Sequence, residues 1–291
     1  MSDLGLLSFY LGIEVHQDAS GFTLRQAHYA KRILELGGME GYNPVHTPME
    51  EKLKLSRDSE AEEVDPTHYH RLVGSLRYLV HTWPDLAFVV GYVSRFMERL
   101  MVEHLQAIKR VLRYVAWTLD YGLHYKHVSG VMRFIGYCDS DLAGDVDTSK
   151  STSGTMFFLD DCLVCWQSTK QKVVTLSSCE AEYITAASAA TQRLWLSRLL
   201  GELLGSKVDV VELKVDSKSA LALAKNPVFH GRSKHIRIKY YFIRDCLEDG
   251  SIKADHIPTT DQLADILTKS LGKNKFQEMR RKIGLEEITQ H

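Results

Sequence analysis

MRFIGYCDSDLAGD, residues 132–145, leads from an apolar run directly into three aspartates. The run Phe134-Ile135-Gly136 predicts a buried strand, and carboxylates on or just past such a strand are costly to place without a positive partner. The residue alternation puts Asp139 at the end of this strand, Asp141 on the turn that follows and Asp145 in a loop. We therefore expect Asp139 to have a binding task and the other two to be supporting neighbours.

The residues that follow alternate between strand and helix patterns. Two strand-like runs in 154–167 are joined by Asp160-Asp161, and residues 177–200 contain no Gly or Pro, which predicts a long helix. The remaining elements are expected as a strand at 210–216, a short helix at 217–225, a basic helix at 234–250, a strand at 251–257 and a final helix at 260–271. The order β-β-β-α-β-α-α-β-α predicts an α/β fold with a mixed sheet and helices on its faces.

Residues before this region have a more helical pattern. We expect a hairpin over 8–26, then a short helix at 28–36, a polar and acidic loop at 44–66, and helices at 69–80, 87–97 and 105–119. The last helix is amphipathic, and its polar face carries Lys109, Arg110 and Arg113. A solvated face is favoured there over a phosphate-contacting one.

Composition describes a soluble globular protein of about two domains, with 291 residues, 44% apolar and 25% charged. A net charge of −1 gives no global field toward nucleic acid, so any such partner needs a local basic patch. Five cysteines indicate reduced thiols, and Cys162 and Cys165 lie in a strand pattern rather than in a metal or redox motif. The apolar start is too short for a membrane span, so we expect an intracellular protein, cytoplasmic or nuclear, without a membrane partner.

Four acids occupy similar places in the predicted elements: Asp139, Glu182, Asp216 and Asp265. Sheet ends are where open α/β folds place their sites. Ser177 and Glu180 match a capping box, which gives Glu180 a structural role. Glu182 is rotated from it by about 200° around the helix and is free to face the sheet. Four unrelated surface acids remain an alternative.

Converging carboxylates repel one another, and hard divalent cations relieve that repulsion. Two Mg²⁺ ions form the usual clamp for in-line phosphodiester displacement. We therefore expect two Mg²⁺ ions, with Mn²⁺ as a substitute, held by Asp139, Glu182, Asp216 and Asp265.

YCDSDLAGD, QKVVTLSSCEAEYITAASAA, VDSKSALALAKNPVFHGRSKHIRIKYYFIRD and DQLADILTKSL closely resemble the ribonuclease H domain of copia-type retrotransposon Pol polyproteins. SDLGLLSFYLGIEV and YHRLVGSLRYLVHTWPDLAF resemble the C-terminal end of the reverse transcriptase that precedes this domain. The resemblance implies three parts: a mostly helical reverse-transcriptase remnant similar to a thumb or connection at 1–125, a ribonuclease H-like five-stranded mixed sheet flanked by helices at 126–271, and a basic tail at 272–291.

The activity implied by the resemblance is Mg²⁺-dependent cleavage of the RNA strand of an RNA–DNA hybrid. The resemblance assigns the catalytic and metal-binding roles to Asp139, Glu182, Asp216 and Asp265. The motif EAEY puts Glu182 at the position of the family's catalytic glutamate. Reverse transcription needs carboxylates on a Tyr-x-Asp-Asp hairpin. The lookalike Phe158-Leu-Asp-Asp161 is better interpreted as a hairpin turn, so we expect no polymerase activity.

Hybrid binding requires contacts to phosphates. The segment 231–244 carries five basic side chains, interleaved with aromatic ones and without an acid: Arg232, Lys234, Arg237, Lys239 and Arg244. A hybrid-contacting role and a plain solvated helix face are equally favoured. His256 is better interpreted as an ordinary strand residue than as an aid to product release.

Two other classes of function remain open. Asp139-Ser-Asp141 after a strand is typical of haloacid-dehalogenase-type phosphatases, although those continue with a helical crossover and here two hairpin-like strands are expected. The other class is a catalytically inactive transposon relic that at most binds nucleic acid or another Pol fragment. In that case the N-terminal helices would expose apolar surface.

Overall fold

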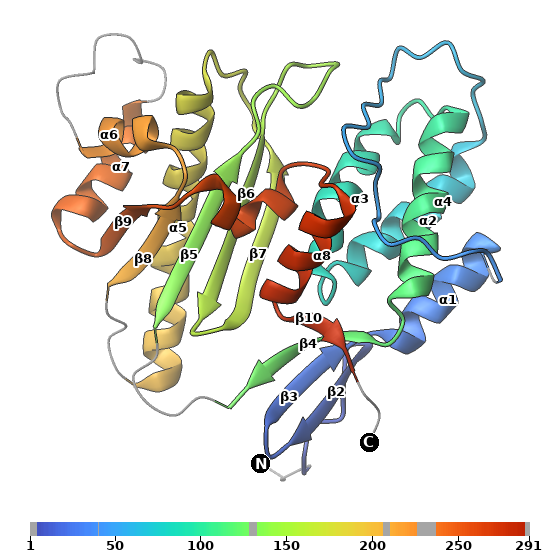
Figure 1. The fold of residues 1–291 in the computed structure, drawn as a ribbon, viewed down its shortest axis with the longest axis horizontal. Helices are drawn as coiled ribbons and strands as arrows, with labels where there is room; N and C mark the ends of the chain where they lie inside the picture. Colours follow the sequence, from blue (N-terminus) through green and yellow to red (C-terminus); the bar gives the residue numbers. More distant parts are fainter. Residues whose placement is uncertain (1–4, 40, 128–132, 206–209, 226–236, 289–291) are drawn as a thin grey trace. The chain divides into compact units, whose positions relative to one another are not determined.

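The computed structural model describes residues 5–39, 41–127, 133–205, 210–225 and 237–288. The chain divides into two compact units, and the first is discontinuous in sequence (Figure 1). Unit 1 comprises Met1–Ser129 together with Lys269–His291, and unit 2 comprises Gly130–Thr268. Among the described residues, no helix is both long enough and apolar enough to cross a bilayer.

Unit 2 contains a five-stranded mixed sheet in the order β7-β6-β5-β8-β9 (Figure 1). Its strands are β5 (Phe134–Ser140), β6 (Thr152–Leu159), β7 (Cys162–Lys170), β8 (Val211–Val215) and β9 (Ile252–His256). The first three pair antiparallel, whereas β8 lies parallel to β5 and β9 parallel to β8. The expected mixed sheet is confirmed. Asp160, at φ 53°, makes the β6–β7 turn as predicted.

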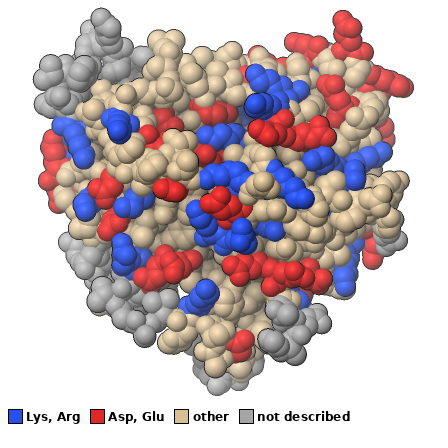
Figure 2. Space-filling view, in the orientation of Figure 1, with Lys and Arg blue, Asp and Glu red and all other residues tan. Residues whose placement is uncertain are grey.

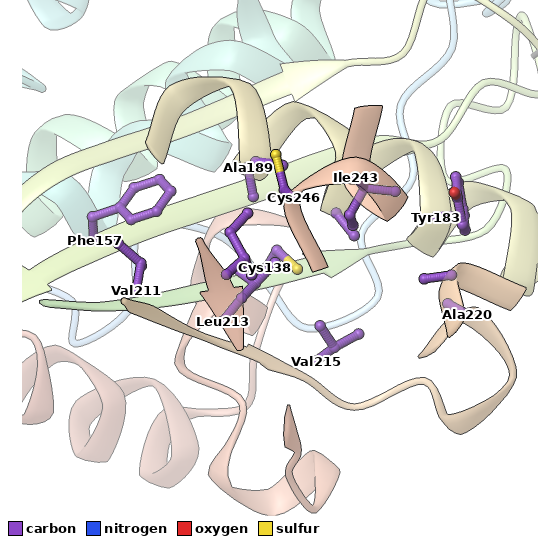
Figure 3. Close-up of a cluster of buried hydrophobic side chains, with 14 of the residues drawn as sticks. Cys138, Phe157, Tyr183, Ala189, Val211, Leu213, Val215, Ala220, Ile243 and Cys246 are labelled. Atoms are coloured by element: carbon purple, nitrogen blue, oxygen red, sulfur yellow. The ribbon is translucent and has the colours of Figure 1, made fainter. Parts of the chain in front are cut away.

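Three helices of unit 2 pack together beside the sheet: α5 (Ser178–Leu204), α6 (Lys218–Lys225) and α7 (Arg237–Glu248). Their apolar side chains and those of β5, β6, β8 and β9 form one core cluster (Figure 3). Small residues dominate the α5 contribution, with Ala186, Ala189 and Ala190 almost fully buried. Small side chains let this helix approach the sheet closely, and it ends at Gly205, whose φ of 64° suits a left-handed cap.

The start of α5 follows the predicted cap with one difference. Ser177 is the N-cap, and its Oγ accepts a hydrogen bond from the Glu180 N–H at 3.2 Å. The Glu180 carboxylate accepts from the N–H of Leu176 at 2.7 Å, one residue before the expected target. Glu180 is therefore a capping residue, as the sequence indicates.

The final helix expected at 260–271 is wrong in type and length. The chain instead forms two short 3-10 helices, η5 (Thr259–Asp261) and η6 (Leu263–Leu267). The Gln262 side chain accepts from the N–H of Ala264, and the Thr268 hydroxyl lies 3.3 Å from the Asp265 carbonyl. These local side-chain bonds compete with α-helical ones and hold a tighter turn.

Unit 1 has its own five-stranded sheet, in the order β1-β2-β3-β4-β10 (Figure 1). All of its pairings are antiparallel, and its strands are β1 (Phe9–Tyr10), β2 (Ile13–Asp18), β3 (Gly21–Arg25), β4 (Tyr121–Lys126) and β10 (Leu285–Glu287). The predicted hairpin over 8–26 is confirmed in β2 and β3. Strands β4 and β10 were not expected from the sequence.

Helices of unit 1 lie close to the predicted ranges: α1 (Ala27–Gly37), α2 (Pro66–Leu79), α3 (Ala87–Val93) continued by η2 (Ser94–Phe96), and α4 (Val102–Trp117). The short 3-10 helix η1 (Pro84–Leu86) precedes α3. On the basic face of α4, Arg110 pairs with Glu50 at 3.0 Å and Arg113 donates to the Asn43 carbonyl at 2.6 Å. This face therefore anchors the loop between α1 and α2, to which Asn43 and Glu50 belong.

Residues 272–291, expected as a separate basic tail, contribute helix α8 (Lys273–Lys282) and strand β10 to unit 1. The Arg280 guanidinium is buried and donates to the hydroxyls of Tyr114 at 3.1 Å and Tyr121 at 3.2 Å. It also stacks over the rings of Trp117 and Tyr121. A cationic residue that looks like part of a solvated tail is thus a core residue of unit 1.

One face of the molecule shows how the surface charges are distributed. On the face drawn in Figure 2, acidic and basic side chains are interspersed, in agreement with the net charge of −1. In the described part of unit 1, exposed large apolar side chains lie at residues 6, 7, 9–11, 22 and 42 and not on α1–α4. The N-terminal helices therefore do not show the exposed apolar surface expected of an unpartnered remnant.

Candidate metal centre

Three of the four predicted acids come together at one end of the unit 2 sheet. Asp139 is the penultimate residue of β5, Asp216 directly follows β8, and Glu182 lies in the second turn of α5. One carboxylate oxygen from each lies within 4.8 Å of the others. Asp139 and Glu182 are 2% and 6% exposed, and Asp216 is half-buried.

Strand pairing brings the two aspartates to the same level. Strands β5 and β8 are parallel neighbours, with Cys138 opposite Val215, so each aspartate follows its partner residue at the carboxyl end of the sheet. Helix α5 packs against β5, and the N–H of Ser140 donates to Glu182 Oε1 at 3.1 Å. Glu182 thus faces the sheet, as predicted from its rotation away from Glu180.

Electrostatics of this cluster favour a cation. Two unit charges 4.8 Å apart repel by about 3 kcal/mol at an effective dielectric constant of about 20. Burial raises the pKa of the neighbouring Cys138 thiol well above its ordinary value, and the charges of Glu182, Asp139 and Asp216 raise it further. Three carboxylates this close together, with those of Asp139 and Glu182 largely buried, fit a hard divalent ion.

The segment around η6 supports the cluster from its two ends. The Thr268 hydroxyl donates a short hydrogen bond to Asp139 Oδ2, and Gln262 Nε2 donates to the Cys138 carbonyl at 2.9 Å. Asp265 lies between them on η6 and is 5% exposed. It lies outside the group of three acids that meet within 4.8 Å.

The other two aspartates of the opening stretch have structural roles. Asp141 accepts from the N–H of Thr152 and so closes the β5–β6 connection. Asp145 is buried, accepts from Thr148 at 2.9 Å and pairs with Lys170 at 3.1 Å. Asp145, expected as an ordinary loop residue, is therefore half of a largely buried ion pair.

The predicted phosphate-binding residues are only partly described. Arg232 and Lys234 lie outside the described residues. Arg237 and Lys239 lie on α7, whereas Arg244 is only 8% exposed. Such burial leaves little of the Arg244 guanidinium accessible to a phosphate. His256 ends β9 and is exposed.

The structure also bears on the phosphatase alternative. After β5 the chain returns antiparallel as β6, where a haloacid-dehalogenase-type enzyme would continue into a helical crossover. This connection counts against that class.

Three residues around the acids were not found by sequence reasoning: Gln171, Gln262 and Thr268. Gln171 and Gln262 donate to the two neighbours of Asp139 in the chain, and Thr268 donates to Asp139 itself. None stands in a periodic pattern or charged cluster, so only the tertiary structure identifies them.

Comparisons with known proteins agree with this architecture. A family model described as "Reverse transcriptase (RNA-dependent DNA polymerase)" matches residues 1–51. The chain is 40% identical over 97% of its length to the retrovirus-related Pol polyprotein from transposon RE1 of Arabidopsis thaliana, and 39% identical over 98% to that from transposon TNT 1-94 of Nicotiana tabacum. It spans 19% and 22% of those two relatives, about a fifth of their length.

A solved structure shares the fold at low identity. The foamy viral protease-reverse transcriptase in complex with dsDNA has a TM-score of 0.50 and 10% identity, covering 86% of this chain and 44% of that one. The five-stranded mixed sheet of unit 2 and its flanking helices form the ribonuclease H-like fold expected from the sequence. Together with the identity over nearly the whole chain, these observations show that the chain belongs to the family of copia-type retrotransposon Pol polyproteins.

Proposed function

We propose that unit 2 is a divalent-metal-dependent ribonuclease that cleaves the RNA strand of RNA–DNA hybrids. The observation that carries the proposal is the convergence of Asp139, Glu182 and Asp216 at the carboxyl ends of two parallel strands of a ribonuclease H-like sheet. Family membership supports the same activity. Unit 1 is proposed to correspond to the C-terminal part of a reverse transcriptase.

The three clustered acids would hold Mg²⁺ or Mn²⁺, with Asp265 as the proposed fourth acid. When bound, two such ions activate a water molecule and stabilise the leaving oxygen of a phosphodiester. Thr268 and the N–H of Ser140 each use one carboxylate oxygen, of Asp139 and Glu182 respectively, and so fix the orientation of these two side chains. Such fixed outer partners raise the precision of a metal site.

Substrate binding is proposed to depend on the backbone of the hybrid. RNA–DNA hybrids present 2′-hydroxyls in a wide, shallow minor groove, and these mark the strand to be cut. Phosphate contacts are proposed for the basic segment 231–244 with the exception of Arg244, which is buried.

Cleavage of a labelled hybrid tests the proposal directly. The full chain is incubated with Mg²⁺ and a 5′-labelled RNA–DNA duplex, with duplex DNA, duplex RNA and single-stranded RNA as controls. The expected result is cut RNA from the hybrid alone, stopped by chelator. Intact hybrid after prolonged incubation, with binding equal in Mg²⁺ and in chelator, would support the alternative of an inactive protein that only binds nucleic acid.

A further inference from the structure

Gln171 follows the last residue of β7 and is 6% exposed. Its backbone N–H donates to the Ser151 carbonyl at 2.7 Å, which fixes the start of its side chain. Its side-chain nitrogen lies within hydrogen-bond distance of four acceptors: Ser140 Oγ at 3.2 Å, Ser153 Oγ at 3.0 Å, the Ala181 carbonyl at 3.0 Å and Thr185 Oγ1 at 3.4 Å.

Two of these acceptors belong to residues that adjoin the clustered acids. Ser140 directly follows Asp139 on β5, and Ala181 directly precedes Glu182 on α5. One amide therefore joins the end of the strand that carries one acid to the first turns of the helix that carries another. The Ser140 N–H, which donates to Glu182, is held in the same place.

The orientation of this amide follows from its partners. The Ala181 carbonyl can only accept, so the NH₂ end of Gln171 must face it. Among the described residues, the buried Oε1 of Gln171 has no hydrogen-bond partner. Leaving a buried acceptor such as Oε1 unsatisfied costs about 1–3 kcal/mol. The hydrogen bonds of the NH₂ group therefore keep the amide in this orientation although Oε1 is left unsatisfied.

The Gln171 amide is not needed merely to join the sheet to α5. The contact between β6 and α5 already has its own hydrogen bond, because Ser153 Oγ and Thr185 Oγ1 lie 2.5 Å apart. What the Gln171 amide adds is the connection from Ser140 to Ala181, the neighbours of the two buried acids.

We propose that Gln171 is a positioning residue, whose amide sets the separation of the Asp139 and Glu182 carboxylates and thereby the affinity of the site for a divalent metal ion. The proposal deepens the proposed function and rests on it for the identity of the metal. Outer-shell partners of metal ligands typically change metal affinity by about 10- to 100-fold when removed.

Direct measurement of Mn²⁺ binding by isothermal titration, with the full chain, tests this role. Gln171→Met keeps the volume and removes the donors, and we expect its Kd for Mn²⁺ to rise at least about tenfold. Gln192→Met is the matched control, because Gln192 also joins α5 to β7, through a contact of 3.5 Å to Cys165 Sγ, away from the acids. We expect its Mn²⁺ affinity to stay within twofold of that of the unmutated chain.

A purely structural role would lower the metal-free melting temperature of Gln171→Met and leave its Mn²⁺ affinity unchanged, and that result would overturn the proposal. Should Gln171→Met fail to fold, Ser140→Ala removes one acceptor of the same amide, and unchanged Mn²⁺ affinity in that variant overturns the proposal equally. A folded Gln171→Met variant should also recover cleavage at high Mg²⁺, which a misfolded site would not.

The two proposals fail in different ways. Tight Mn²⁺ binding by the unmutated chain without hybrid cleavage contradicts the nuclease function and leaves the role of Gln171 intact. Absence of Mn²⁺ binding by the unmutated chain, or binding that Asp139→Asn does not weaken, overturns both.

Discussion

Asp139 is buried and its carboxylate is oriented by Thr268. The charge of this carboxylate and its position can therefore contribute separately to cleavage. Asp139→Asn keeps the shape and removes the charge. We expect hybrid cleavage to fall by more than about 100-fold, the upper end of what outer-shell partners contribute. Initial rates at saturating Mg²⁺ measure the loss, and an unchanged melting temperature serves as the folding control. A rate within tenfold of that of the unmutated chain would contradict the assignment.

Asp265 offers a graded comparison, because it lies outside the group of acids that meet within 4.8 Å. We expect Asp265→Asn to reduce cleavage by about tenfold, less than Asp216→Asn, since an outer carboxylate acts through the inner ones. The two variants are compared in the same assay. Equal losses would place Asp265 on a par with the clustered acids.

Asp85 in unit 1 is a buried acid whose environment predicts a pH dependence. Burial raises its pKa from 3.8 to about 6, against the opposing effects of the Tyr114 hydroxyl and the Arg280 charge. Because the folded-state pKa lies above the unfolded one, this group stabilises unit 1 most below about pH 4, and that contribution is lost as pH rises through about 6. The full effect of such a shift is about 3 kcal/mol.

Asp85→Asn should therefore reduce the difference in unfolding free energy between pH 4 and pH 7. Urea titrations followed by tryptophan fluorescence measure it, with Trp83 and Trp117 reporting on unit 1 and Trp166 and Trp195 on unit 2. Identical pH profiles for the variant and the unmutated chain would show that Asp85 titrates normally.

At the scale of single elements, the sequence predicts most of unit 2. The order of its strands follows from apolar runs and turn residues, and the different roles of Glu180 and Glu182 follow from helix geometry alone. Three of the four proposed acids come together as expected, because parallel strands bring their carboxyl ends to one edge of a sheet.

Elements that depend on distant partners could not be predicted. η6 has helical spacing, but the side chains of Gln262 and Thr268 hold it as a 3-10 turn. The sequence of α8 predicts a solvated basic segment because most of its residues are charged. It is buried through Phe276, Met279 and Arg280, and the partners of Arg280 stand up to 166 residues away in the chain.

The N-cap of α5 can be tested separately from the chemistry. Ser177→Ala removes the acceptor of the Glu180 N–H, and a lost N-cap typically costs about 1 kcal/mol. We expect the free energy of unfolding of unit 2 to fall by that amount, with Mn²⁺ affinity preserved because the acids are untouched. Denaturant unfolding followed by circular dichroism measures the change. A parallel loss of metal affinity would show that the cap also positions Glu182.

At the scale of the whole molecule, Arg280 connects the last segment of the chain to the interior of unit 1. Arg280→Met removes the donor to the Tyr114 hydroxyl, which in turn donates to the buried Asp85, and it removes the positive charge that lowers the pKa of Asp85. Removing one charge from a buried network of this kind costs about 3–5 kcal/mol. We expect a matching loss of unit 1 stability, together with a change in the fluorescence of Trp117, over which the guanidinium stacks.

Lys282→Met is the control for this variant. Lys282 lies on the same helix and forms an exposed pair with Glu278 at 2.7 Å, and such surface pairs contribute about 0.5 kcal/mol or less. Similar losses in the two variants would show that any cation on α8 contributes equally and that the buried network is unimportant.

The interrupted path of unit 1 has a consequence for protein synthesis. The edge of β4 that β10 covers is translated about 160 residues before β10 itself (285 − 126 = 159), and all of unit 2 emerges from the ribosome in between. At about 5–20 residues per second this interval lasts roughly 8–30 seconds. Unit 2 therefore has time to fold first, while the nascent unit 1 carries an uncovered strand edge of the kind that pairs with other chains.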